Sequence, residues 1–204
     1  MTTSAPRWIY AFAEGDGRNK MLLGGKGANL CEMTRIGLNV PPGFVITTEA
    51  CLACLGDAQR NLPAGLLDAA RTEMASLERQ TGKRFGGGDD PLLVSVRSGS
   101  AMSMPGMMDT ILNLGLNQTT LAALIRHTGN ERFGYDAWRR FIQLFGKVAL
   151  GVPDALFDEQ FEAVKSRVGV KQDVMLGADE LREIGERFLQ VVQRHTGQPF
   201  PADP

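Results

Sequence analysis

The strongest constraint on the fold is a change of pattern near Asn117. Before this residue, short strand signals alternate with helical segments. After it, apolar residues recur only at helical spacing, and Asn, Gly or Pro separates one segment from the next. The helices expected there cover residues 118–128, 131–150, 153–168 and 178–196. The sequence therefore predicts an α+β half followed by a small all-helical subdomain.

The first half contains three strand signals and one glycine-rich helix start. Residues 7–12 alternate polar and apolar, "FVIT" (44–47) follows a Pro-Pro-Gly turn, and "PLLVSVRSG" (91–99) is the clearest strand. The two-residue period of that last strand places Arg97 at its end, where a loop begins. A helix is expected from about residue 26 to 36, so "GGKGAN" lies at its N-terminus.

Size, charge and composition limit the classes of function. The chain has 204 residues, of which 43% are apolar and 22% charged, as is typical of a globular protein. A net charge of −1 gives no general attraction to nucleic acid or acidic membranes, which favours a small-molecule partner. The sequence shows neither a secretion signal nor a long apolar run. With three cysteines, we expect a cytoplasmic protein with reduced thiols.

The residue pattern does not indicate a metal site. Cys51 and Cys54 form C-x-x-C, but a structural zinc site needs four ligands and there is no second close pair of Cys or His. His127 and His195 are far apart in the sequence. We expect the two thiols to be small buried groups on one helix face, and we assign no metal ligand.

The lysine among the glycines has two possible readings. A helix N-terminus offers unpaired N–H groups and the positive end of the helix dipole, and glycines let a phosphate approach the backbone around Lys26. A Walker A loop is excluded, because it needs Ser or Thr after the lysine and Gly27 stands there. On local grounds, a phosphate site and a tight turn with a solvated lysine both remain open.

Three further features carry candidate chemistry. The planar fork of Arg97 suits a pair of phosphate oxygens, and the alternative is a salt bridge to a neighbour such as Asp109. The methionines of "SMPGMMDTILNLGLN" (103–117) either close over a flat group such as adenine or fill gaps in the core. Arg139 and Arg140 lie in an aromatic helix, so one is expected to face outward and the other towards the packed side.

Four segments of the chain occur together in a specific order: "LLGGKGANLCEM", "VPPGFVITTEAC", "PLLVSVRSGSAMSMPGMMDTILNLGLN" and "RFGYDAWRRFIQLFG". In this order they resemble the pyruvate, phosphate dikinase family, in its N-terminal nucleotide-binding part. The methionine segment is the specific one, because the related phosphoenolpyruvate synthases have a different, acidic sequence there. The resemblance extends over essentially the whole chain.

This resemblance implies a fold and a reaction. The fold is the first lobe of an ATP-grasp nucleotide-binding domain, followed by a helical subdomain. The reaction converts ATP, inorganic phosphate and pyruvate to AMP, pyrophosphate and phosphoenolpyruvate with Mg²⁺. A pyrophosphoryl group passes from ATP to a histidine on a central domain, and a C-terminal barrel then phosphorylates pyruvate. Neither His127 nor His195 lies in the T-S-H context of that carrier histidine.

The resemblance also implies the site residues. Lys26 and Arg97 match the family's catalytic, ATP-phosphate-binding lysine and arginine, and Arg140 matches an arginine associated with the γ-phosphate or inorganic phosphate. The remaining nucleotide-binding candidates flank these positions in the glycine and methionine segments; they are Gly24, Gly25, Gly27, Met104, Met108, Asp109 and Thr110.

The organisation expected from the resemblance has three parts. Residues 1–116 form the α+β lobe, 117–198 the helical subdomain and 199–204 a linker to a second lobe that carries the Mg²⁺ ligands. The second lobe, the central domain and the barrel are expected outside this chain, so the chain alone is expected to be inactive. The alternatives are a stand-alone nucleotide- or protein-binding module of the same family, and another enzyme of the wider dikinase group that acts on glucan or on pyruvate with water.

Overall fold

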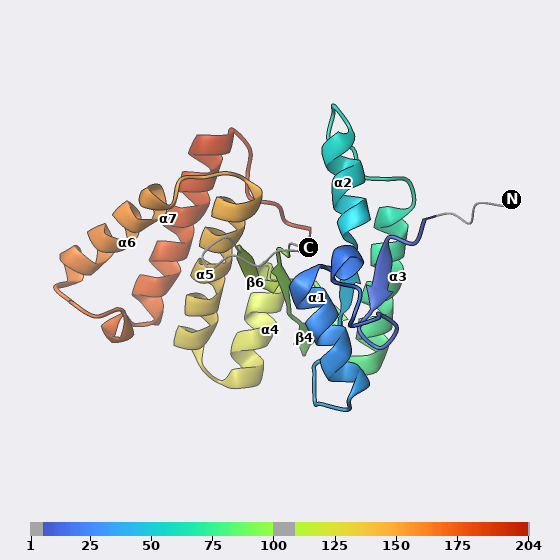
Figure 1. Ribbon diagram of the computed structural model, residues 1–204. Coiled ribbons are helices and arrows are strands. Elements are labelled where there is room, and N and C mark those ends of the chain that lie inside the picture. Colours follow the sequence, from blue (N-terminus) through green and yellow to red (C-terminus); the bar gives the residue numbers. More distant parts are fainter. Residues whose placement is uncertain (1–5, 100–108, 204) are drawn as a thin grey trace, which may run out of the picture. The chain divides into compact units, whose positions relative to one another are not determined.

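The structure, a computed structural model, describes residues 6–99 and 109–203 (Figure 1). The contacts divide the chain into two compact units. The first unit comprises the described residues up to Gly82, with Ser98 and Gly99. The second comprises Lys83–Arg97 and the described residues from Asp109 onward. Both units combine helices with a small amount of sheet, so the fold is α+β as the sequence predicts; the boundaries at residues 116 and 198 stay predictions.

The first unit is a two-stranded antiparallel sheet with three helices. Its elements are β1 (Ile9–Ala11), α1 (Lys20–Arg35), β2 (Phe44–Ile46), α2 (Thr48–Gly56) and α3 (Leu66–Thr81). Helix α1 packs on β2 and α2, and α3 packs on β1. One small core contains Ile9, Ala50 and Leu66, and another contains Leu23, Ala28 and Cys31. The Thr47 hydroxyl accepts a hydrogen bond from the Ala50 amide at 3.2 Å and caps α2.

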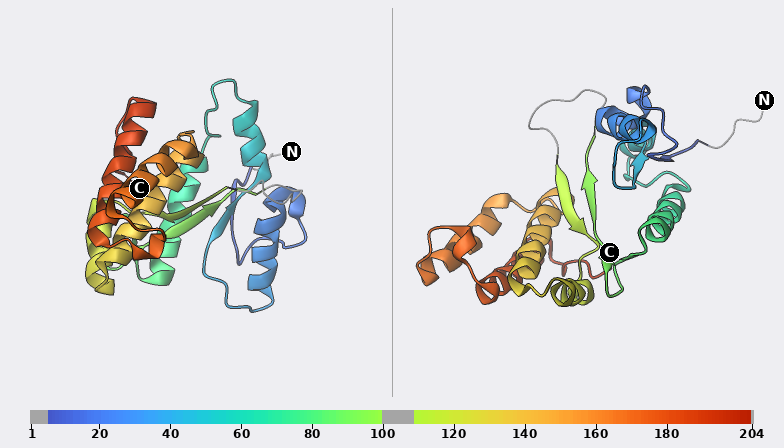
Figure 2. Two further views of the ribbon diagram at one scale, coloured as in Figure 1. Left: turned by 90° about the vertical axis from the view of Figure 1, so that its left-hand side faces the viewer. Right: turned by 90° about the horizontal axis from the view of Figure 1, so that it is seen from below.

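The second unit contains the other strands and four long helices. Its elements are β3 (Arg84–Phe85), β4 (Pro91–Leu92), β5 (Val94–Arg97), β6 (Thr110–Leu114), α4 (Gln118–Thr128), α5 (Glu131–Ala149), α6 (Asp154–Val168), a 3₁₀ turn (Asp173–Met175) and α7 (Ala178–Thr196). Strands β3 and β4 pair in parallel, whereas β5 and β6 form an antiparallel ribbon that runs beside α5 (Figure 2). The four predicted helices are confirmed to within one residue at each end.

Local signals explain where these helices begin and end. Asn117 forms a capping box with Thr120, and the Asn130 side chain accepts a hydrogen bond from the Phe133 amide at 2.9 Å. Gly129, Gly169 and Gly197 follow α4, α6 and α7 with positive φ, the left-handed conformation that ends a helix. A single apolar core, in which α5 packs against α7 and β6, then holds the elements together.

The strand predicted over residues 91–99 differs in detail. The structure divides it into β4, which pairs with β3, and β5, which pairs with β6. The register between β5 and β6 shifts between Val94 and Val96. A bulge of this kind interrupts the strict alternation of faces, so the predicted period of two does not hold along the whole segment.

Among the helices that the structure describes, none is both long and apolar enough to cross a membrane.

Candidate functional site

The glycine segment lies at a break in helix α1. The helix begins at Lys20, six residues before the predicted start, but Gly24 has φ 66° and ψ 163° and divides it into two helical segments. Only glycine adopts such angles readily. Lys26 therefore lies in the first turn after the break, at a helix start as the sequence indicates. Its side chain is half-buried, and within residues 6–99 and 109–203 it forms no ion pair.

Contacts from β2 and α2 support this break. A Cβ on Gly27 would lie 2.7 Å from Cγ1 of Val45, so a glycine is needed for α1 to pack this closely on β2. The break at Gly24 interrupts the hydrogen-bond series of the helix, and the Thr48 hydroxyl donates to the carbonyls of Met21 and Leu22. Two of the three glycines around Lys26 thus have a structural reason to be there, quite apart from any ligand.

Three of the predicted site residues meet at one end of the β5–β6 ribbon. Arg97 is paired in register with Thr110, and Asp109 immediately precedes Thr110. The side chain of Arg97 is exposed, and among the described residues it forms no ion pair. The alternative of a salt bridge between Arg97 and Asp109 is therefore not found. An exposed guanidinium at a strand end can bind an anion without first breaking an internal pair.

Helix α5 adds a cation that the sequence analysis missed. The Lys147 ammonium lies 2.7 Å from Oδ2 of Asp154, and the amide of Gln143 donates to Oδ1 of the same carboxylate at 2.9 Å. The hydrogen bond to Asp154 raises the pKa of Lys147, and the charge of Asp109 acts in the same direction. Asp109 and Lys147 are therefore electrostatic neighbours. The available signal was the spacing of Asp136, Arg140, Gln143 and Lys147, which fall on one helix face.

The two consecutive arginines of α5 have different environments. Arg139 is 7% exposed, contacts Asp136 at 2.7 Å and lies over the ring of Phe161 at 4.6 Å. Burial lowers the pKa of Arg139, and the Asp136 carboxylate partly offsets this. Arg140 faces outward, and its Nε donates to the other oxygen of Asp136 at 3.0 Å. The prediction that one arginine is exposed and its neighbour packed is confirmed, and Arg140 is the exposed one.

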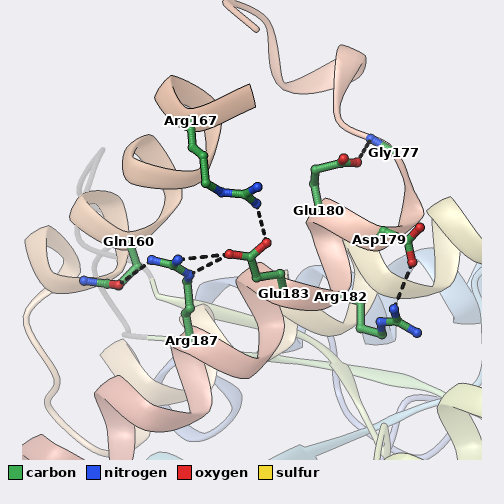
Figure 3. Close-up of polar contacts among 8 residues, drawn as sticks. All are labelled: Gln160, Arg167, Gly177, Asp179, Glu180, Arg182, Glu183 and Arg187. Carbon is green, nitrogen blue, oxygen red and sulfur yellow. Dashed lines mark hydrogen bonds and ion pairs between the residues drawn. The ribbon is translucent and has the colours of Figure 1, made fainter. Parts of the chain in front are cut away.

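Two shallow grooves on α6 and α7 are lined by charged side chains that mostly satisfy one another (Figure 3). Arg167 from α6 and Arg187 from α7 both pair with Glu183, and Arg187 also reaches Gln160. Arg182 pairs with Asp179 at 2.9 Å. Each groove encloses about 400 Å³ or slightly less, and neither is lined by a residue predicted for the nucleotide site. We therefore assign them no ligand.

All three thiols are free. The prediction that Cys51 and Cys54 are both buried is wrong: Cys51 is exposed and Cys54 half-buried, because little of the chain packs over that side of α2.

Met104 and Met108 lie outside the described residues. Within the described part of the chain, no three His, Cys, Asp or Glu side chains gather in a way that could hold a metal ion.

Comparison with known proteins gives a consistent result. The family model "Pyruvate phosphate dikinase, AMP/ATP-binding domain" matches residues 20–84, which include the glycine segment. The chain is 55% identical to "Pyruvate, phosphate dikinase" of Entamoeba histolytica, 46% to that of Rhizobium meliloti and 45% to that of Clostridium symbiosum. These alignments cover 96–97% of this chain but only 22–23% of the relatives, so the chain spans about a fifth of their length. Along nearly all of its residues, the chain is similar to the N-terminal part of pyruvate, phosphate dikinases.

Proposed function

We propose that this chain binds ATP as the N-terminal nucleotide-binding part of a pyruvate, phosphate dikinase. The observation that carries the proposal is the 45–55% identity to such enzymes over 96–97% of the chain. The AMP/ATP-binding family model over residues 20–84 supports it independently. In the whole protein, the proposed reaction is conversion of ATP, phosphate and pyruvate to AMP, pyrophosphate and phosphoenolpyruvate. The proposed partners of this chain are the carrier-histidine domain and the pyruvate-binding barrel.

Lys26 and Arg97 are the proposed ligands of the ATP phosphates. When a phosphoryl or pyrophosphoryl group is transferred, negative charge is spread over its oxygens, and fixed cations stabilise that charge without forming a covalent bond. Lys26 brings an ammonium to the start of a helical segment, where backbone N–H groups add to the positive potential. Arg97 brings a planar pair of donors that matches two phosphate oxygens.

The other proposed ligands surround these two cations in the sequence. The backbone of Gly24, Gly25 and Gly27 would approach the phosphates, and Asp109 and Thr110 would lie beside Arg97 at the strand end. Met104 and Met108 are proposed to contact the adenine ring. Arg140, on the outer face of α5, is proposed to bind the γ-phosphate or inorganic phosphate.

Mg²⁺ accompanies ATP in this proposal, but the described residues offer no site of their own for it. Mg²⁺ prefers carboxylate oxygens and phosphate oxygens in octahedral geometry. The described part of the chain has no cluster of three candidate ligands, so no residue here is assigned to the ion and no step is derived through it. Its ligands are proposed to belong to the second lobe of the nucleotide-binding domain.

Isothermal titration of the chain with ATP and Mg²⁺ tests the proposal. Arg97→Ala should weaken binding about 10-fold or more, the range expected when a hydrogen bond to a charged group is lost. Arg126→Ala is the matched control, because Arg126 is an exposed arginine whose ion pair among the described residues is with Asp89 on the surface. Equal dissociation constants for wild type and Arg97→Ala would remove Arg97 from the site. Absence of any binding by the wild type would contradict the proposal for this chain.

A further inference from the structure

Asp136 holds two arginines with a single carboxylate. Its Oδ1 accepts a hydrogen bond from Nε of Arg139 at 2.9 Å and lies 2.7 Å from Nη2 of the same residue in an ion pair. Its Oδ2 accepts from Nε of Arg140 at 3.0 Å. The three residues lie on consecutive turns of α5, at the i, i+3 and i+4 spacing that brings side chains together. One carboxylate shared by two guanidinium groups leaves one positive charge uncompensated within the trio.

The carboxylate of Asp136 is fixed from the buried side. Arg139 is 7% exposed, and its guanidinium lies 4.6 Å from the centre of the Phe161 ring, on α6. A buried guanidinium packed on an aromatic ring has few alternative positions. Because Arg139 binds Oδ1 with two nitrogens, the direction of Oδ2 is set by the core of the unit. Arg140 is therefore attached to a rigid point rather than to another mobile surface side chain.

Arg140 differs from other paired arginines because it uses Nε alone. Arg126, Arg167 and Arg182 each direct a terminal Nη2 to a carboxylate, and Arg35 uses both Nε and Nη2. Arg140 pairs through Nε, and among the described residues its two terminal nitrogens have no hydrogen-bond partner. Its side chain remains 55% exposed. The guanidinium is thus held through Nε, while its two terminal nitrogens, the terminal fork, can donate to a ligand.

We propose that Asp136 is a positioning residue, which orients the terminal fork of Arg140 towards a phosphate group. The inference rests on the proposed function, because that function supplies phosphate as the ligand of Arg140. The ligand chemistry is a terminal phosphate with two free oxygens, whether it belongs to ATP or to inorganic phosphate. Fixing the guanidinium before the ligand arrives reduces the conformational entropy that binding would otherwise cost, which is substantial for arginine.

The test needs variants that do not confuse positioning with folding. Asp136→Asn alone leaves the buried Arg139 without its counter-charge, which is strongly destabilising. The double variant Asp136→Asn, Arg139→Met removes both members of the buried pair and leaves Arg140 in place without its carboxylate. Arg139→Met alone is the matched control, because it keeps the Asp136 contact with Arg140. Arg140→Ala reports the loss of the guanidinium itself.

The wild type and each variant are titrated with ATP plus Mg²⁺ and, separately, with inorganic phosphate, after thermal unfolding has shown which of them are folded. We expect Arg140→Ala to weaken binding about 10-fold or more and the double variant to weaken it severalfold. Arg139→Met should bind less tightly than the wild type, because the carboxylate loses its buried anchor, but more tightly than the double variant. Restoring the carboxylate as Asp136→Glu in the Arg139→Met background should recover part of the affinity. A loss confined to ATP assigns the fork to the nucleotide, and a loss confined to phosphate assigns it to the free anion.

The outcomes separate this inference from the function on which it rests. If Arg140→Ala binds weakly but the double variant binds like Arg139→Met, Arg140 is used and Asp136 does not position it, so the inference fails alone. If Arg140→Ala binds both ligands like the wild type, the inference also fails, while ATP binding through Lys26 and Arg97 stands. If the folded wild type binds neither ligand, the proposed function fails and this inference fails with it.

Discussion

Arg97 and Thr110 face each other across the β5–β6 ribbon, at the last residue of β5 and the first residue of β6. Twelve residues of sequence separate the two, so their pairing is a property of the sheet rather than of a local motif. Asp109 stands next to Thr110, and its charge reaches Lys147 on α5. Strand ends that place exposed polar groups beside one another are common positions for ligand-binding side chains.

Replacing Lys26 should weaken nucleotide binding with little change in stability. The lysine is half-buried and forms no ion pair with any described residue, so Lys26→Met should retain the fold. Loss of the ammonium should raise the dissociation constant for ATP about 10-fold or more. Lys171→Met, at an exposed position after α6, is the control and should bind like the wild type. Calorimetric titration measures both, and equal affinity of the two variants would exclude Lys26.

The break in α1 should tolerate no side chain at Gly24. Gly24→Ala forces an L residue to φ 66° and ψ 163°, and we expect a loss of about 1–3 kcal/mol in unfolding free energy. The adjacent Gly25 has helical angles, so Gly25→Ala should leave stability unchanged or raise it by about 0.5–1 kcal/mol. Urea unfolding of the two variants compares them directly. Equal stabilities would mean that α1 is continuous at this point.

The close packing of α1 on β2 should appear as a coupling between Gly27 and Val45. A Cβ at position 27 would lie 2.7 Å from the valine side chain, so Gly27→Ala should cost about 1–3 kcal/mol through overpacking. Val45→Ala makes room for the added methyl group. The double variant should therefore lose less unfolding free energy than the sum of the losses of the two single variants. A double-mutant cycle by urea unfolding measures this coupling. Strict additivity would argue against the contact.

The Lys147–Asp154 pair should contribute to stability at neutral pH and lose its effect in acid. Hydrogen bonds from Lys147 and Gln143 lower the pKa of Asp154 in the folded state. A carboxyl group with a depressed folded pKa stabilises the fold above its unfolded pKa of about 4, and the contribution disappears as pH falls through the folded value. The difference in unfolding free energy between wild type and Asp154→Asn should therefore shrink below about pH 4.

The control for that experiment is Asp179→Asn, which removes a carboxylate from an exposed pair with Arg182. Such a surface pair is expected to contribute only about 0–1 kcal/mol at neutral pH, so its loss in acid should hardly change the difference in unfolding free energy. Thermal or urea unfolding between pH 3 and pH 7 gives the two profiles. A difference for Asp154→Asn that stays constant over this range would show that its carboxylate acts only through packing.

The three thiols should react in the order of their exposure. Cys51 is exposed on α2, Cys54 is half-buried, and Cys31 is fully buried with a pKa that burial raises. Because the thiolate is the reactive form, a maleimide should label Cys51 first and leave Cys31 unmodified in the native protein. Peptide mass spectrometry after a short reaction identifies the sites. Labelling in urea is the control, and rapid native labelling of Cys31 would contradict its burial.

Much of the fold could be predicted from the sequence because the signals are local. Asn117 and Asn130 cap helices through contacts with residues three positions away, and glycines end three of the four helices of the second unit. The family resemblance could also be recognised from the sequence, since it depends on the order of four sequence segments. The roles proposed for Lys26, Arg97 and Arg140 at a nucleotide depend on how distant segments meet a ligand, which no local pattern encodes.

The sequence by itself thus determined the helices, the α+β class and the family resemblance. The tertiary structure decided which side chains are buried and which are exposed. At the Gly24 break, the Thr48 hydroxyl donates to two carbonyls that lie 26 and 27 positions earlier in the chain. Arg139 rather than Arg140 is buried because Phe161 of α6 covers it, and Cys51 is exposed because little of the chain covers it. Caps and spacing act over one helical turn, but burial depends on contacts between distant segments, which no local pattern encodes.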